Sequence, residues 1–295
     1  MAQPELDPRA ILAALGYGAG VTAITRVTGG RDTAIWRIER GDATYVLRVF
    51  RPEQAHIARR EAAIMRETVP GVPIPAVQAT GEWAGRPALL LHWCAGHTLL
   101  DALRADPRRF QALARLFGAT QARLHAAPAP PFLLAEERSW IDWAGAGAGP
   151  LGARLRTVAT DPPSILHFDY HPLNLLVAAD QVTGLIDWAN VHVGDRRADL
   201  ARTLTILRFA PHEPGPTATA LRLLSRLLEA GWRRGYRAVA GPLGGMAPFY
   251  AWAGIALLND LAPHAGQPAD RLATAHTAPI RRWIARWERV AGRET

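Results

Sequence analysis

The chain of 295 residues contains no lysine, because all 34 of its basic residues are arginine. Any mechanism that depends on a lysine amine is therefore excluded. Cysteine is almost as scarce: Cys94 is the single one, so no internal disulfide can form and a reducing, cytoplasmic setting is expected. No apolar run approaches the ~18 residues of a membrane span, and the N-terminus lacks the basic and apolar segments of a signal peptide. We therefore expect no membrane partner.

Acidic residues are few in the last third of the chain. Residues 201–295 hold 13 Arg and 6 acidic residues, a net charge of +7 out of +8 for the whole chain. A basic surface can bind nucleic acid, but no zinc-finger spacing, RNP-like strand or helix-turn-helix accompanies this charge. Arginines on solvated helix faces are the simpler explanation. We therefore expect no nucleic-acid partner. The expected oligomeric state is a monomer or a homodimer.

The pattern of apolar residues changes near residue 95. Before it, short alternating runs predict strands, with one helix over 54–67 and a shorter one over 7–16. After it, apolar residues recur at helical spacing. The expected strands are 21–28, 33–39, 44–50, 76–80 and 87–93, and the main later helices are 101–104, 110–125, 199–209, 217–234, 248–261 and 271–291. The sequence predicts an α+β fold in two lobes, a small antiparallel sheet with one main helix (1–94) and a mostly helical lobe (95–295).

One stretch interrupts the helical part and carries most of the candidate chemistry. Residues 165–177 and 184–188 are apolar runs with polar side chains at their ends, and a turn at Ala179-Asp180-Gln181 makes them a β-hairpin. This hairpin brings Asn174 and Asp187 near each other, with Asp169 at its mouth. Two oxygen ligands beside a free carboxylate suit binding of Mg²⁺-nucleotide and removal of a proton from a hydroxyl.

A zinc site is an alternative interpretation of the same stretch. His167, Asp169 and His171 would share one face of an extended strand, as in some metallohydrolases. Pro172 breaks that strand, however, and no further cluster of His, Asp or Cys supplies the remaining ligands. The oxygen ligands favour Mg²⁺ over zinc.

Two features of the first lobe suggest contacts with phosphate. Gly29-Gly30 lies between two strands, where backbone N–H groups can approach a phosphate, although most such turns are structural. Arg48 lies inside an apolar strand, and Glu61 follows in the helix thirteen residues later. An ion pair between them could hold the guanidinium against the phosphates of a nucleotide. Further on, Asp199 either caps a helix or braces the hairpin from behind.

The order of these motifs resembles the aminoglycoside phosphotransferase family, whose fold is protein-kinase-like. The resemblance rests on His167-x-Asp169-x-x-x-x-Asn174, on Ile186-Asp187-Trp188, and on Gly194-Asp195 followed by Asp199-Leu200-Ala201. It implies that Asp169, next to His167, is the catalytic base. It also implies that Asn174 and Asp187 hold Mg²⁺.

The resemblance also implies where ATP or GTP binds. Arg48 takes the place of the phosphate-binding strand lysine and Glu61 that of its helix partner, with Gly29 and Gly30 in the phosphate loop. The backbone of His92, Trp93 and Cys94 is the expected contact of the purine.

Three departures from the family pattern stand out. Arg48 replaces the lysine, and its guanidinium is bulkier and forked. Phe168 stands where the family usually has glycine, so its side chain must point into the core or narrow the substrate mouth. The phosphate loop, Arg31-Asp32-Thr33, follows the family only loosely. None of these changes removes the base or a metal ligand, so an active enzyme is expected.

The resulting prediction is a small-molecule kinase that transfers a γ-phosphoryl group to a hydroxyl. The acceptor is expected to be an antibiotic such as an aminoglycoside or a macrolide, or a hydroxylated metabolite, as for a homoserine or choline kinase. A polycationic acceptor is less favoured, because the C-terminal helices that usually form its pocket are basic here. A pseudokinase-like module that binds nucleotide without transfer is the alternative from another class.

Overall fold

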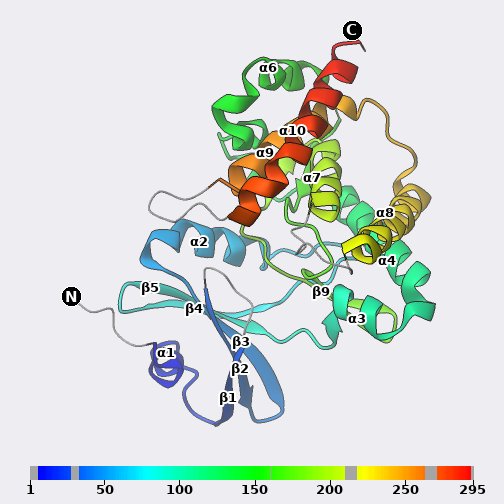
Figure 1. Ribbon diagram of the computed structural model, residues 1–295. Coiled ribbons are helices and arrows are strands. Elements are labelled where there is room, and N and C mark those ends of the chain that lie inside the picture. Colours follow the sequence, from blue (N-terminus) through cyan, green and yellow to red (C-terminus); the bar gives the residue numbers. More distant parts are fainter. Residues whose placement is uncertain (1–5, 28–32, 160, 210–217, 263–270, 294–295) are drawn as a thin grey trace.

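The computed structural model describes residues 6–27, 33–159, 161–209, 218–262 and 271–293. It has a five-stranded antiparallel sheet at its N-terminal end and a helical part beyond it (Figure 1). This arrangement confirms the predicted α+β fold. The division into domains at residues 94 and 95 stays a prediction.

The N-terminal sheet has the strand order β1-β2-β3-β5-β4. A helix, α2 (Ala55–Ile64), lies between this sheet and the helical part (Figure 1). The strands are β1 (Val21–Val27), β2 (Ala34–Arg40), β3 (Ala43–Val49), β4 (Val77–Trp83) and β5 (Arg86–His92).

Both faces of this sheet are covered. Leu90 of β5 belongs to a small core with Ile11 and Leu12 of the first helix, α1 (Pro8–Ala14), whereas its neighbours Leu89 and Leu91 belong to the main core. Because side chains alternate along a strand, β5 contributes to both cores and is apolar from residue 87 to residue 91. The central strands are therefore fixed from two sides, which holds Arg48 of β3 in place.

The helical part contains every other long element. Two of its helices, α4 (Phe110–Ala126) and α8 (Ala218–Ala240), pack against each other over much of their length. They approach closely at Gly118, where an added Cβ atom would lie 1.9 Å from the carbonyl oxygen of Trp232. Its remaining helices are α3 (Leu99–Ala105), α5 (Pro131–Leu134), α6 (Gly149–Val158), α7 (Arg196–Phe209), α9 (Ala247–Asp260) and α10 (Arg271–Ala291), with 3₁₀ segments at Pro107–Arg109 and Trp140–Ala148. A further 3₁₀ segment, Pro52–Gln54, precedes α2.

The predicted hairpin is present. Strands β8 (Leu175–Ala178) and β9 (Gln181–Leu185) are joined by Ala179 and Asp180, both with positive φ, as a tight two-residue turn requires. A short strand, β6 (His97–Thr98), pairs with β8. The strand before the hairpin, β7 (Ser164–Leu166), pairs instead with β10 (His192–Gly194).

The largest difference from the sequence-based prediction is α6. No helix was expected over residues 149–158, but one begins at Gly149 and buries Leu155. Tertiary packing outweighs the weak helix propensity of its glycines. None of the described helices is both long and apolar enough to span a membrane.

Candidate active site

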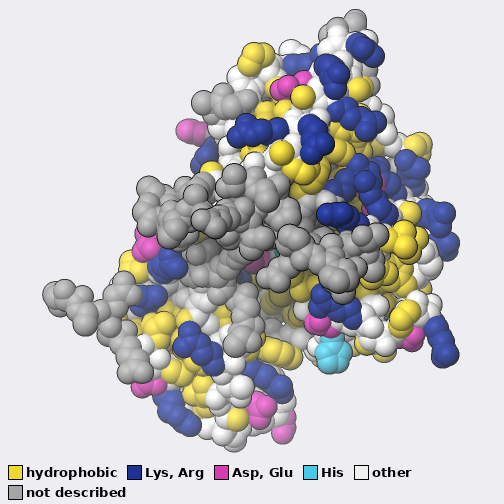
Figure 2. All heavy atoms as spheres, viewed as in Figure 1, with side chains coloured by type: hydrophobic (Ala, Val, Ile, Leu, Met, Phe, Trp, Pro, Cys, Tyr) yellow, Lys and Arg dark blue, Asp and Glu magenta, His cyan; other side chains and the backbone are white. Residues whose placement is uncertain are grey.

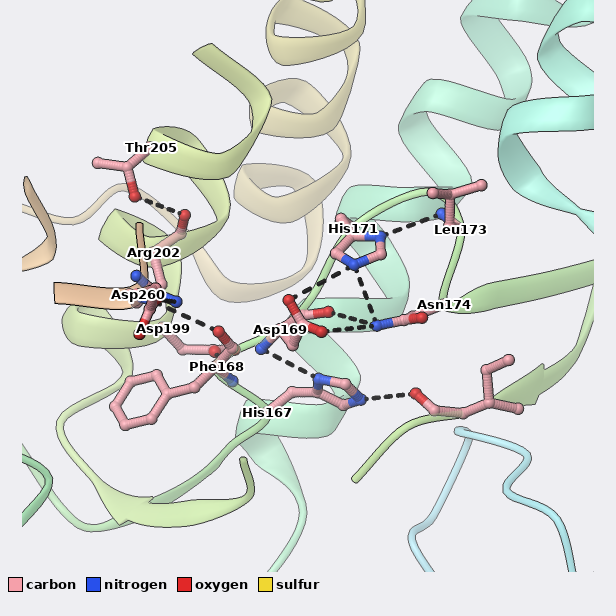
Figure 3. A network of polar contacts seen from close by, with 11 residues as sticks. His167, Phe168, Asp169, His171, Leu173, Asn174, Asp199, Arg202, Thr205 and Asp260 are labelled. Atoms are coloured by element: carbon pink, nitrogen blue, oxygen red, sulfur yellow. Dashed lines mark hydrogen bonds and ion pairs between the residues drawn. The ribbon is translucent and has the colours of Figure 1, made fainter. Parts of the chain in front are cut away.

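Asp169 lies in the loop between β7 and β8, and its carboxylate is held by two side chains (Figure 3). Asn174 Nδ2 donates to Asp169 Oδ2 at 3.2 Å, and His171 Nε2 lies 3.4 Å from Oδ1. Burial raises the pKa of Asp169, but the hydrogen bond and charge of His171 outweigh it, so the pKa is lowered. With 30% of the side chain exposed, Asp169 is an ionised carboxylate open to a ligand.

His167 is buried behind this loop. Its Nε2 donates to the carbonyl oxygen of Ile186 at 3.1 Å, and its Nδ1 accepts from the backbone N–H of Asp169 at 3.3 Å. Burial lowers the pKa of His167 despite the nearby carboxylates, which keeps the ring neutral. The structure thus gives His167 the position of a residue that orients Asp169 and ties its loop to the end of β9.

Asn174 and Asp187 flank the hairpin, with Asn174 directly before β8 and Asp187 two residues after β9. The backbone N–H of Ile186 donates to the carbonyl oxygen of Asn174 at 2.9 Å, which puts Asp187 one residue beyond the pairing. Because Asn174 Nδ2 is engaged by Asp169, its Oδ1 is the atom left for a cation. Asp187 has a positive φ and a side chain that is 44% exposed. Two such oxygen donors fit a hard divalent cation such as Mg²⁺.

Arg48 of β3 links the N-terminal sheet to this hairpin. Its Nη1 lies 2.7 Å from Glu61 Oε2 and its Nη2 3.3 Å from Oε1, and Nη2 is also 3.7 Å from Asp187 Oδ1. The Arg48–Glu61 pair predicted from spacing is therefore present. Burial raises the pKa of Glu61 to about 7, although the charge of Arg48 opposes this shift.

Asp199 braces the loop that carries Asp169. It is fully buried, and its carboxylate accepts from the backbone N–H of Phe168 at 2.6 Å, from Gln121 Nε2 at 2.9 Å and from His125 Nε2 at 2.9 Å. Burial raises the pKa of Asp199, but His125 and the other donors outweigh it and lower the pKa.

The interpretation of Asp199 as a helix cap is wrong, because α7 begins at Arg196 and Asp195 Oδ1 accepts from the Arg197 N–H. Gln121 and His125 were missed in the sequence. Their signal is a pair of polar residues that continue the i, i+4 row of the apolar residues Leu113 and Phe117.

Phe168 has a φ of 60°, a conformation that favours glycine. Its side chain is buried and points away from Asp169 (Figure 3), against Trp140, Trp143 and Trp252. Phe168 therefore fills the core and does not narrow the substrate mouth.

The expected purine contacts lie at the end of the N-terminal sheet. The backbone N–H groups of His92 and Trp93 donate to the carbonyls of Ala76 and Thr44, so Cys94 offers the next backbone N–H along the chain. Burial raises the pKa of Cys94, which keeps it a thiol. The remaining candidates, Gly29 and Gly30, lie outside the described residues.

The structure does not support the zinc interpretation. Both ring nitrogens of His167 are engaged within the protein. Among the described residues, no group of three or more His, Cys, Asp or Glu side chains is placed to hold a metal. A cavity of about 780 Å³ between the loop after α2 and the β8–β9 turn contains none of the candidate site residues.

A model of the phosphotransferase enzyme family matches residues 23–240, which is most of the chain. The chain belongs to this family. The prediction of a phosphotransferase is thereby confirmed, as is the resemblance seen in the sequence. The matched residues include Arg48, Asp169 and Asp187 and every other candidate site residue.

Solved structures share the fold at low sequence identity. A thermostable mutant of aminoglycoside phosphotransferase APH(4)-Ia, in complex with ADP and hygromycin B, is similar with a TM-score of 0.65 at 16% identity, covering 94% of this chain and 98% of that one. Amicoumacin kinase hAmiN, in complex with AMP-PNP, Ca²⁺ and Ami, has a TM-score of 0.62 at 14% identity, covering 95% and 93%. Aminoglycoside-3'-phosphotransferase of type VIII has a TM-score of 0.59 at 20% identity, covering 84% and 96%. The protein-kinase-like fold predicted for this chain is thus confirmed.

Proposed function

We propose that this phosphotransferase transfers the γ-phosphoryl group of Mg²⁺-ATP or Mg²⁺-GTP to a hydroxyl group of a small molecule in the cytoplasm. The observation that supports this most directly is the ionised, partly exposed Asp169, held by Asn174, whose backbone carbonyl accepts from Ile186, the residue before Asp187. A carboxylate beside two oxygen donors is what proton removal next to a metal-bound phosphate requires.

In this mechanism Asp169 orients the acceptor hydroxyl and accepts its proton. Asn174 Oδ1 and Asp187 would hold the Mg²⁺, which when bound offsets the negative charge of the phosphates. Arg48, fixed by Glu61, is aimed at the same place, since its Nη2 already lies 3.7 Å from Asp187. Because the transition state is loose, positioning and electrostatics contribute most of the rate.

The nucleotide would bind between Arg48 and the backbone at Cys94. Two relatives support a nucleotide donor and a divalent cation, since one was solved with ADP and the other with AMP-PNP and Ca²⁺. His167 would hold Asp169 in position. His92 and Trp93 would contact the purine through their backbone, at the connection between the two predicted lobes. Gly29 and Gly30 would approach the phosphates through their backbone.

The acceptor is an alcohol, either an antibiotic or a hydroxylated metabolite. Arginines spread over the visible face of α8 and α10 (Figure 2), and the last third of the chain is basic, which disfavours a polycationic acceptor. A nucleotide-binding module without transfer is the weaker candidate, because Asp169, Asn174 and Asp187 are all present and brought together.

The test is a phosphorylation screen over antibiotics and hydroxylated metabolites with both ATP and GTP. Acceptor-dependent release of ADP or GDP is expected from the wild-type enzyme. Asp169→Ala should lower turnover by about 10²- to 10⁴-fold while nucleotide still binds. Asp187→Ala should weaken Mg²⁺-nucleotide binding itself. Near-normal turnover of Asp169→Ala on the acceptor would refute the assigned role.

A further inference from the structure

A buried arginine lies beside the candidate catalytic base and has no part in the mechanism above. Arg202 is on α7, and its Nε lies 3.4 Å from the carbonyl oxygen of Phe168, the residue before Asp169 (Figure 3). Its Nη2 donates to Asp260 Oδ2 at 2.7 Å. Arg202 and Asp260 are 58 residues apart in the sequence, and Asp260 is the last residue of α9.

The two partners are exposed to different degrees. The Arg202 side chain is 4% exposed, whereas that of Asp260 is 36% exposed. Trp143 lies against both, with its Nε1 3.4 Å from Asp260 Oδ1 and its ring 5.8 Å from the Arg202 guanidinium carbon. The Asp260 carboxylate is therefore more accessible than the Arg202 guanidinium that compensates its charge.

Arg202 also has an unused donor. Within the part of the chain that the structure describes, its Nη1 is buried and has no hydrogen-bond acceptor. A buried guanidinium nitrogen without a partner is costly, because it has lost its hydrogen bonds to water. The free donor and the partly exposed carboxylate next to it match a ligand group that both accepts and donates a hydrogen bond.

A hydroxyl group is such a ligand group, whereas an ammonium group only donates. The charge of Asp260 is already neutralised by Arg202, so the pair has little attraction for a second cation. An anionic ligand group would in turn be repelled by the ionised carboxylate of Asp169.

We propose that the Arg202–Asp260 pair binds a neutral hydroxyl group of the acceptor next to the hydroxyl that Asp169 activates. The acceptor is then a neutral polyol, such as a sugar or cyclitol ring, and not a polyamine. This inference rests on the proposed function, of which it specifies the substrate class.

The experiment compares matched acceptors on the full-length enzyme with Mg²⁺ and nucleotide. Methyl glucoside and myo-inositol are the neutral probes, and glucosamine and 2-deoxystreptamine are the amine probes. Binding is measured by calorimetry with a non-hydrolysable ATP analogue, and turnover by ADP release. We expect a neutral probe to bind at least tenfold more tightly than its amine counterpart.

Two variants test the pair itself. Arg202→Gln should raise KM for the neutral probe at least tenfold, with a smaller change in kcat and none in the KM of the nucleotide. Because Arg202 is buried and this variant can fail to fold, Asp260→Asn provides a second test. It leaves the charge of Arg202 uncompensated, so glucuronate should gain affinity relative to methyl glucoside. Arg226→Gln, which replaces an arginine that is 63% exposed on α8, is the matched control.

Tighter binding of the amine probes, no binding of any of the four probes, or unchanged selectivity of Asp260→Asn would each overturn the inference. Failure of the proposed function looks different: nucleotide would then bind, but no acceptor in the wider screen would release ADP. Calorimetric binding of a neutral probe does not depend on transfer, so the two failures are separable.

Discussion

The backbone N–H of Phe168 donates to the Asp199 carboxylate at 2.6 Å, across 31 residues of sequence. Asp199 also accepts from Gln121 and His125 of α4, so one buried carboxylate joins two helices to the loop that holds Asp169. The position of the candidate base is therefore fixed by a fully buried carboxylate, which is not itself open to a ligand.

Asp199→Asn should destabilise the protein by about 3 kcal/mol, because the amide leaves buried donors without an acceptor. Urea unfolding measures this change, with Asp42→Asn in an exposed turn as the control. Since the pKa of Asp199 is lowered by folding, its contribution is present above the ordinary pKa of about 4 and is lost as pH falls through the folded value. The difference between wild type and variant should therefore shrink below pH 4. An equal difference at pH 3 and pH 7 would argue against an ionised Asp199.

Phe168 offers a test of backbone strain. Removal of its buried ring should cost about 3–5 kcal/mol, but glycine relieves the positive φ that alanine retains. Phe168→Gly should therefore be more stable than Phe168→Ala by about 1 kcal/mol. The control is Phe117, an equally buried ring inside α4, where glycine should be less stable than alanine by about 1 kcal/mol. Thermal unfolding of the four variants decides, and the same order at both positions would contradict the strain argument.

Glu61 predicts a pH dependence of the opposite sign. Its pKa rises from 4.5 to about 7 on folding, so between these values the folded protein holds a proton that the unfolded chain has released. Stability due to this group should then fall as pH rises from 4.5 to 7, by up to about 3 kcal/mol. Glu61→Gln removes this slope, whereas Glu67→Gln, an exposed neighbour, should retain it. Denaturation at pH 5 and pH 8 measures the difference, and parallel slopes for wild type and Glu61→Gln would refute the shift.

Local sequence patterns were enough to predict the hairpin and the Arg48–Glu61 pair. Asn174 and Asp187 flank two strands that a short turn joins. Arg48 and Glu61 lie on one strand and on the helix that follows it in the chain. Residues that meet through tertiary packing left no such signal.

His125 of α4 reaches Asp199 of α7 across 74 residues of sequence, and Arg202 of α7 reaches Asp260 of α9 across 58, so both contacts depend on how the helices are arranged in the fold. The helix α6 was missed for a similar reason, since burial of Leu155, and not propensity, stabilises it. The roles of the site residues stay predictions for the experiments above.

Arg48 is the departure from the family pattern that bears most directly on nucleotide binding. Its forked guanidinium contacts both oxygens of Glu61 and reaches toward Asp187, whereas the single ammonium of a lysine cannot make these contacts together. Arg48→Met should weaken nucleotide binding by about 10- to 100-fold, the effect of one charge-assisted contact to phosphate. Arg48→Lys keeps the charge but not the fork and should lie between wild type and Arg48→Met. Fluorescence titration with nucleotide and Mg²⁺ measures the three affinities, with Arg104→Met, 66% exposed on α3, as the control. If Arg48→Met binds nucleotide as tightly as wild type, the guanidinium does not contact the phosphates.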